Sequence, residues 1–305
     1  MTRVALIGLG EVGRVFAEDL RAAGIRDLTA WDTAFADPAS RASRNAREVG
    51  LAPSGSAPAA VSGADLVVSA VTAAQCVAAA ETAAASVTDD TWFFDLNSAS
   101  PGHKQAAAAA IGASGGRYVE AALMSPIAPK RLSSPFLLGG PHAAAFSAAA
   151  PFFGLGSVTV VSDDVGRAAA TKLCRSVIVK GLESLLTESL LAARVHGVER
   201  EVLESLPNIL PPADWDAVAG YFISRSLQHG KRRSDEMEEA AATVAEAGVD
   251  PWMSAAAVER QRWAAQFPQA AEAGSTIGMV DAVLAAMASV PPASDSTDDT
   301  EELQQ

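Results

Sequence analysis

The stretch that decides the fold is RVALIGLGEVG, residues 3–13. It begins with a mostly apolar run of strand length and continues into residues with apolar side chains at helical spacing. In that context Gly8 permits a tight turn, Gly10 lets the backbone approach a pyrophosphate, and Gly13 lets helix and strand pack closely. The helix N-terminus adds unpaired N–H groups for the phosphates. The sequence therefore predicts a dinucleotide site made of Gly8, Leu9, Gly10, Glu11, Val12 and Gly13.

A carboxylate follows the next expected strand, residues 28–31. Asp32 stands 19 residues after Gly13, where it would accept hydrogen bonds from the adenosine ribose. It would also repel a 2′-phosphate, which favours NAD over NADP. Arg41 and Arg44 lie a turn or two further on and keep NADP open as the cofactor. The alternative interpretation is an accidental glycine turn beside a surface aspartate.

The rest of the chain changes character after residue 163. Before that point, strands alternate with helices, which predicts an α/β fold with a doubly wound parallel sheet. Further strands are expected at 65–71, 92–96, 117–122, 136–139 and 157–161, and helices at 38–49, 73–84 and 104–111. Beyond it only helices are expected, at 165–196, 199–206, 214–228, 234–247, 251–265 and 276–288. The predicted domains are 1–163 (NAD(P)-binding), 164–290 (all-helical) and 291–305 (a disordered acidic tail).

Composition narrows the classes of partner. The chain has 305 residues and a formal net charge of −13, which opposes non-specific binding to nucleic acid or an anionic membrane. An anionic substrate must therefore find a local basic pocket. Cys76 and Cys174 sit in apolar runs, and we expect two buried thiols in a reducing compartment. Neither a metal-binding cluster, a signal peptide nor a membrane span is expected, and the protein is predicted to be cytoplasmic.

A second candidate site is the loop DLNSASP, residues 95–101. It follows a buried strand at the carboxyl end, where open α/β sheets bind ligands. The hydroxyls of Ser98 and Ser100 suit a substrate carboxylate, although Ser100 followed by proline is also an ordinary helix cap. Asn97 is expected on the nicotinamide side, together with Val71 and Thr72 at the end of the preceding strand.

A third candidate is a polar stripe on the long helix, which otherwise reads as apolar. On a helical wheel its members fall within about 80° of one another. They are Lys172, Ser176, Lys180, Glu183 and Thr187, with Arg175 to one side. So narrow a stripe favours the lining of a cleft over a solvent-facing surface. A partly desolvated Lys172 would have its pKa lowered toward neutrality and could exchange protons with a hydroxyl. The alternative is a structural ion pair between Lys172 and Glu183 or another acidic neighbour.

The motifs GLGEVG, DLNSASP and GRAAATK, the last leading into the long helix, resemble the β-hydroxyacid dehydrogenases, which include 3-hydroxyisobutyrate and 6-phosphogluconate dehydrogenases. The resemblance implies a Rossmann domain followed by a helical domain that makes a homodimer, with Lys172 as the acid/base residue and the serine loop binding substrate. The family usually has asparagine one turn after the lysine, where this chain has Ser176 preceded by Arg175. We therefore expect Arg175 and Ser176 to contact the substrate.

The helical half carries one dense basic cluster, His229 to Arg233. Residues 226–237, SLQHGKRRSDEM, resemble a less-characterised, phosphogluconate dehydrogenase-like branch of the family. Arg232 is a candidate to hold a substrate carboxylate or phosphate. The alternative is a surface ion pair with Glu236, four residues further along the helix.

The sequence thus predicts an NAD(P)-dependent oxidoreductase that transfers a hydride between nicotinamide and a small β-hydroxy acid. One alternative keeps the fold but reduces an imine or a keto acid. Imine reductases usually have tyrosine or aspartate at the position of Lys172, so the lysine favours alcohol or carbonyl chemistry. The other alternative is a dinucleotide-binding regulator without activity.

Overall fold

A computed structural model describes residues 2–208 and 214–289 of the chain. Its described residues fall into two compact units, one within Met1–Gly181 and Ser234–Val258, the other within Leu182–Arg233 and Glu259–Gln305. The predicted boundary after residue 163 does not coincide with these units; among the described residues it lies between the last strand and the helices that follow. The predicted tail at 291–305 lies outside the described residues.

The first unit contains a seven-stranded sheet with the strand order β2-β1-β3-β4-β5-β6-β7. The strands are β1 Arg3–Ile7, β2 Asp27–Trp31, β3 Leu66–Ser69, β4 Trp92–Asp95, β5 Arg117–Leu123, β6 Phe136–Gly139 and β7 Val158–Ser162. The first five strands are mutually parallel, which confirms the doubly wound α/β fold. β6 pairs antiparallel to β5, and β7 runs parallel to β6. The last two strands differ from the uniformly parallel prediction because the β5–β6 connection contains only a 3-10 turn and no crossover helix.

Helices cover both faces of this sheet. They are α1 Glu11–Ala22, α2 Arg41–Glu48, α3 Ala57–Val61, α4 Cys76–Ala84, α5 Pro101–Ala113 and α6 Ala143–Ala149. Short 3-10 turns lie at η1 Thr33–Ala36, η2 Ala73–Gln75, η3 Arg131–Ser133, η4 Ala150–Phe153, η5 Leu206–Asn208 and η6 Pro268–Ala273.

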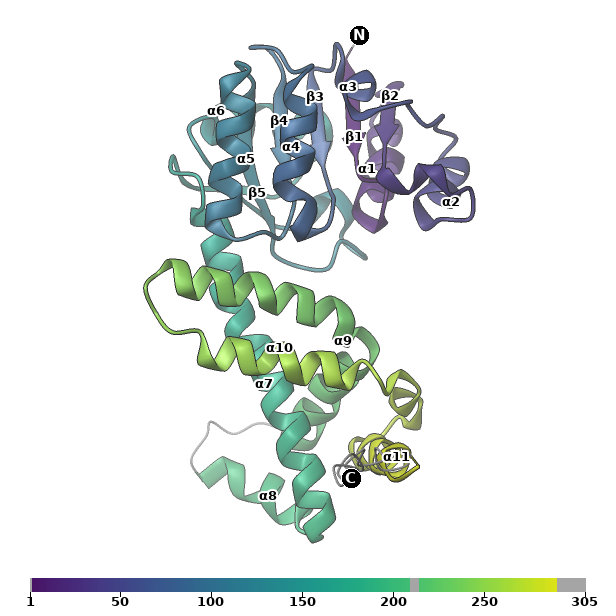
Figure 1. Cartoon of the computed structure of the whole chain (residues 1–305), viewed down its shortest axis with the longest axis vertical. Helices are drawn as coiled ribbons and strands as arrows, with labels where there is room; N and C mark the ends of the chain where they lie inside the picture. The colour runs from purple at the N-terminus through teal and green to yellow at the C-terminus, as the bar shows by residue number, and fades with distance from the viewer. Residues whose placement is uncertain (1, 209–213, 290–305) are drawn as a thin grey trace, which may run out of the picture. The chain divides into compact units, whose positions relative to one another are not determined.

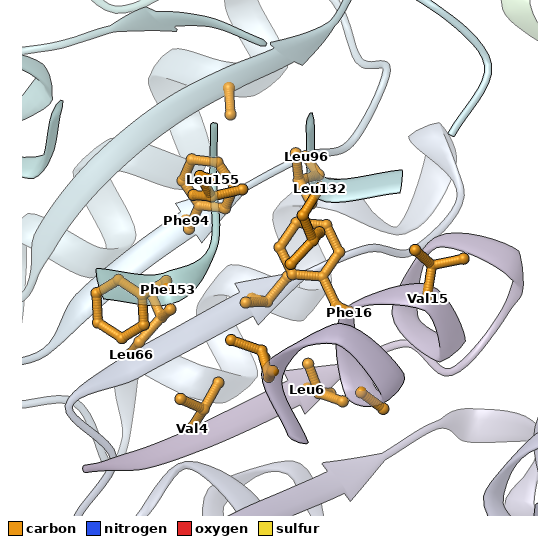
Figure 2. Packing of buried hydrophobic residues seen from close by; sticks show 14 of the residues in the cluster. Val4, Leu6, Val15, Phe16, Leu66, Phe94, Leu96, Leu132, Phe153 and Leu155 are labelled. Carbon is orange, nitrogen blue, oxygen red and sulfur yellow. The ribbon is translucent and has the colours of Figure 1, made fainter. Parts of the chain in front are cut away.

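The two faces of the sheet carry separate cores because side chains alternate along each strand. On one face Leu6 and Phe94 pack with Phe16 of α1 (Figure 2). On the other face Ile7 and Phe93 pack against α3, α4 and α5. Figure 1 shows α4 and α5 side by side over that second face. This arrangement leaves the carboxyl ends of the parallel strands as the edge where their loops meet.

In the part of the chain that the structure describes, only helices follow β7: α7 Arg167–His196, α8 Glu199–Ser205, α9 Trp215–Glu246, α10 Trp252–Ala264 and α11 Thr276–Ala288. Parts of α7, α9 and α10 pack together within the first unit, around Val177, Met237 and Val258. In the second unit Leu190, Ile223 and Val280 form the core. Among the described residues, no helix combines the length and the apolar character that a membrane span requires.

The predicted break between helices at 214–228 and 234–247 is wrong, because α9 runs unbroken through Gly230. A Cβ added at Gly230 would lie 2.5 Å from the Gln261 carbonyl oxygen and 2.7 Å from the Ala265 nitrogen. The glycine therefore lets α9 approach the end of α10 closely. A glycine inside a helix is about 1 kcal/mol less favourable than alanine, and the close packing against α10 requires it at this position.

Candidate active site

The glycine-rich turn between β1 and α1 has the conformation that the motif predicts. Gly8 has φ +92°, and a Cβ there would lie 2.4 Å from the Ala70 carbonyl oxygen. A Cβ on Gly13 would lie 2.1 Å from the Gly8 oxygen, so that helix and strand touch at this position. Nothing lies within 4 Å of a Cβ added at Gly10, which precedes α1 and provides no side-chain cap. The helix N-terminus is therefore open to a phosphate.

Asp32, directly after β2, anchors this turn. Its Oδ2 accepts a hydrogen bond from the Leu9 N–H at 2.8 Å, and its Oδ1 accepts one from the Ala34 N–H at 2.9 Å. Each carboxylate oxygen keeps a further lone pair, so ribose hydroxyls can still be accepted. Leu9 is buried, whereas Val12 is half-buried and Glu11 is exposed.

A residue that the sequence interpretation missed also supports the turn. Asn45, buried on α2, donates from Nδ2 to the carbonyl oxygens of Leu9 at 2.8 Å and Gly10 at 3.1 Å. The only local signal was an asparagine on the apolar face of the helix expected at 38–49. On the exposed face of α2, Arg41 lies 3.9 Å from the Glu11 carboxylate. Arg44 donates to the carbonyl of Ala39.

The loops after β3 and β4 are tied together by Asn97. This side chain is buried, and its Oδ1 accepts the Val71 N–H at 2.7 Å while its Nδ2 donates to Ser69 Oγ at 3.0 Å. Val71 is half-buried and Thr72 is exposed at the start of η2. The three residues predicted on the nicotinamide side, Val71, Thr72 and Asn97, thus lie together at the carboxyl edge of the sheet.

A buried charged cluster lies beneath the β4 loop. The Asp95 and Lys104 side chains are each at most 1% exposed, and Lys104 Nζ lies 2.9 Å from Asp95 Oδ1. Tyr118 Oη and Cys76 Sγ donate to Asp95 Oδ2 at 2.7 Å and 3.3 Å. Asp95 Oδ1 also accepts the Asn97 N–H at 2.9 Å, so the cluster fixes the start of the loop that carries Ser98.

The cluster was not predicted, because a single lysine in an alanine-rich helix, such as Lys104, is expected to face solvent. Its burial requires the carboxylate partner that the fold supplies. Burial, followed by the charge of Asp95, raises the pKa of the Cys76 thiol to about 12. The same two causes raise the pKa of the Tyr118 hydroxyl well above its usual value.

Lys172 and Ser98 meet at this edge, with Lys172 Nζ 2.5 Å from Ser98 Oγ. Both side chains are half-buried. Lys172 belongs to the second turn of α7, and the first turn is held by Glu120 on β5. The fully buried Glu120 carboxylate accepts the N–H groups of Gly166 at 2.7 Å and Ala169 at 2.6 Å. Sequence interpretation missed Glu120, because its partners lie 46 and 49 residues further along the chain.

The predicted polar stripe on α7 is turned away from solvent. Ser176 and Lys180 are 8% exposed, and Lys180 Nζ donates to Ser176 Oγ at 3.0 Å and lies 2.9 Å from the Glu236 carboxylate of α9. Within the second unit, Glu183 is buried 2.9 Å from Arg233 Nη2. Thr187 Oγ1 donates to the Glu183 carbonyl oxygen at 2.7 Å.

Arg175 lies outside the stripe and is exposed. Its Nη1 donates to the Met124 carbonyl oxygen at 2.9 Å, which places the guanidinium at the carboxyl end of β5. Cys174, beside it, is exposed, so the expectation of two buried thiols is wrong for this residue and right for Cys76. An apolar flanking sequence did not imply burial, because this position faces outward from the helix. Arg232 is exposed on α9 and belongs to the second unit.

Ser100 is buried and caps α5. Its Oγ donates to Glu246 Oε1 at 2.8 Å, and its N–H donates to Glu239 Oε2 at 2.8 Å. Both glutamates come from the part of α9 that belongs to the first unit. The structure thus brings Ser98 to Lys172 and Ser100 to α9. In the described part of the chain, no group of three His, Cys, Asp or Glu side chains is arranged to hold a metal ion.

Comparisons with known proteins agree with this fold. The sequence model of the NAD binding domain of 6-phosphogluconate dehydrogenase matches residues 3–162, and a domain of unknown function, DUF1932, matches residues 193–264. No curated protein sequence matches the chain.

Solved structures with a similar fold include three that cover most of the chain. A conserved hypothetical protein from Sinorhizobium meliloti 1021 is 34% identical, with 93% of this chain and 96% of that chain covered and a TM-score of 0.74. The conserved protein MTH1747, described as structurally similar to 3-hydroxyacid dehydrogenases, is 29% identical over 86% and 96%, with a TM-score of 0.67. A 3-hydroxyisobutyrate dehydrogenase from Mycobacterium tuberculosis, solved with L-serine, is 19% identical over 93% and 99%, with a TM-score of 0.70, and shows the shared fold.

Proposed function

Because the chain belongs to the β-hydroxyacid dehydrogenase family, we propose that it is an NAD(P)-dependent oxidoreductase acting on a small β-hydroxy acid, with Lys172 as the acid/base residue. The contact between Lys172 Nζ and Ser98 Oγ carries the proposal. It places an amine at the edge of the sheet where the glycine-rich turn also ends. Ligands of open α/β sheets bind at this edge.

The residues present fit a nicotinamide dinucleotide. The open backbone at Gly10 and the uncapped start of α1 would hold the pyrophosphate, and Asp32 would accept the adenosine ribose hydroxyls. The carboxylate favours NAD, while Arg41 and Arg44 would be the partners of a 2′-phosphate if NADP is used. When bound, the nicotinamide supplies the acceptor for the hydride that leaves the carbinol carbon.

Lys172 supplies the proton chemistry. In the oxidation its neutral amine takes the proton from the substrate hydroxyl as the carbonyl forms, and in the reduction its ammonium returns a proton to the carbonyl oxygen. Ser98 Oγ lies within hydrogen-bonding distance of that amine and orients it. Glu120 keeps the lysine in register with the sheet by holding the first turn of α7.

The test is the absorbance of reduced nicotinamide across a panel of β-hydroxy acids with NAD⁺ and NADP⁺. We expect Lys172→Ala to lower kcat by about 10²- to 10⁴-fold, the usual contribution of a general acid/base, while NAD⁺ still binds. Lys130→Ala, an exposed lysine near η3, is the matched control and should behave as the wild type.

Three outcomes would contradict the proposal in different ways. Turnover that survives in Lys172→Ala removes this residue from its role. NAD⁺ binding without turnover of any acid, in wild type and variant alike, points to a regulator without activity. Efficient imine reduction without oxidation of hydroxy acids would mean that the protein is an imine reductase.

A further inference from the structure

The N-terminus of α5, which Ser100 of the predicted substrate loop caps, is already occupied by two carboxylates of the chain itself. Glu239 Oε2 accepts the Ser100 N–H at 2.8 Å, and Glu246 Oε2 accepts the Gly102 N–H at 3.0 Å. Glu246 Oε1 also accepts the Ser100 hydroxyl at 2.8 Å. An anionic substrate group placed here would meet two like charges and would have to displace both from their donors.

The basic side chains of the site are not equally available. Lys180 is buried against Glu236, and Lys172 contacts Ser98. Arg175 is exposed, and among the described residues its guanidinium makes one hydrogen bond, from Nη1 to Met124, and no ion pair. A guanidinium has five N–H donors in a planar fork, so this single bond orients the group and leaves donors for a planar carboxylate.

The placement of Arg175 relative to Lys172 suits a bifunctional substrate. The two residues are three positions apart on α7, so their Cβ atoms lie about 5–6 Å apart. Lys172 reaches the loop after β4, and Arg175 reaches the loop after β5. These strands are paired neighbours in the sheet, with Asp95 at the end of β4 opposite Glu120 in the middle of β5. A β-hydroxy acid has one carbon between its hydroxyl-bearing carbon and its carboxyl carbon, a spacing compatible with a base and a cation one helical turn apart.

We propose that Arg175 is the residue that selects an anionic substrate, by binding its carboxylate while Lys172 exchanges the hydroxyl proton, and that the first turn of α5 takes no part in this binding. The inference rests on the proposed function and deepens it. It also accounts for how a chain of net charge −13 attracts an anion, since one exposed cation near Lys172 replaces a general positive field.

The experiment compares each β-hydroxy acid with its neutral primary amide. The measured quantity is the ratio of kcat/KM for the acid to kcat/KM for the amide. Loss of a charge-assisted, bidentate contact should lower this ratio roughly 10- to 100-fold in Arg175→Ala. Arg175→Lys, which keeps the charge but loses the fork, should lower it less. Arg167→Ala is the matched control, an exposed arginine on another side of the same helix that should leave the ratio as in the wild type.

A second measurement is independent of turnover: calorimetric binding of malonate to the NAD⁺-saturated protein. Malonate should bind the wild type and Arg167→Ala with the same affinity and Arg175→Ala roughly 10-fold or more weakly. If the wild type oxidises no acid but Arg175→Ala still binds malonate more weakly than the wild type does, the proposed function fails and the anion site stands. Any of three results would overturn the inference. They are an unchanged ratio in Arg175→Ala, an equal loss of the ratio in Ser100→Ala, and a wild type that neither prefers acids nor binds malonate.

Discussion

Replacing Glu120 by glutamine tests how the sheet places Lys172, the proposed acid/base residue. The substitution keeps the shape of the side chain but exchanges one carboxylate oxygen for an NH₂ group. In the native protein both oxygens are acceptors, for the N–H groups of Gly166 and Ala169. In the variant one of these N–H groups faces another donor in a fully buried position. The first turn of α7 must then shift or lose a hydrogen bond.

The magnitude follows from those contacts. A hydrogen bond to a charged group contributes about 1.5–3 kcal/mol, and an unpaired buried N–H costs a similar amount. Release of the buried charge offsets part of this loss, so we expect the free energy of unfolding to fall by about 2–3 kcal/mol. Lys172 lies three residues beyond Ala169, so a shift of about 1 Å there would lower kcat by up to about 10²-fold. Cofactor affinity should not change, because the glycine-rich turn follows a different strand.

Three measurements check this reasoning: urea unfolding for stability, NAD⁺ affinity by calorimetry, and kcat with the best hydroxy acid. Glu120→Asp keeps a carboxylate on a side chain one methylene shorter, so its stability and its kcat should both lie between those of Glu120→Gln and the wild type. Glu81→Gln, on the exposed side of α4, makes the same chemical change and should have no effect. A Glu120→Gln variant with wild-type stability and wild-type kcat would refute the role assigned to this contact, and loss of NAD⁺ affinity in parallel with kcat would indicate general unfolding instead.

Four further predictions concern the two cysteines, Gly230 and Asp32. At pH 8 iodoacetamide should label Cys174 quickly and Cys76 only on unfolding, since one thiol is exposed and the other buried, and peptide mass mapping distinguishes them. Because the Cys76 pKa is about 12 when folded against 9.0 for the free thiol, its contribution to stability should be fully present below pH 9 and be lost between pH 9 and 12, measured against Cys76→Ala. Gly230→Ala should lower the free energy of unfolding by about 1–3 kcal/mol, because the added methyl group overpacks against the end of α10. No change in stability would mean that α9 and α10 can move apart at no cost. Asp32→Ala should shift the ratio of NAD⁺ to NADP⁺ affinity toward NADP⁺ by about tenfold, and an unchanged ratio would remove the carboxylate from cofactor selection.

The sequence by itself determined the features that depend on neighbouring residues. The dinucleotide turn is visible because Gly8 needs a positive φ and Gly13 packs against the Gly8 carbonyl oxygen, both within one strand–turn–helix unit. The alternation of strands and helices follows from periodicities of 2 and 3.6, which are local properties of the chain. The narrow polar stripe containing Lys172 could be read for the same reason, since it lies on a single helix. The sequence could not show that the helix continues through Gly230, because helix propensity takes no account of α10, which the glycine allows to approach.

Only the tertiary structure decided which charges meet. Glu120 reaches the start of α7 from 46 residues away, and Glu239 reaches Ser100 across 139 residues. Lys104 is buried against Asp95, although its own helix is rich in alanine and its sequence context resembles a surface. A buried charge or N–H group is stable only when it is paired, and the partner is chosen by how strands and helices come together. The sequence therefore singled out Lys172 and the serine loop as candidates, while the pairing of distant carboxylates decided which of the two serines contacts Lys172.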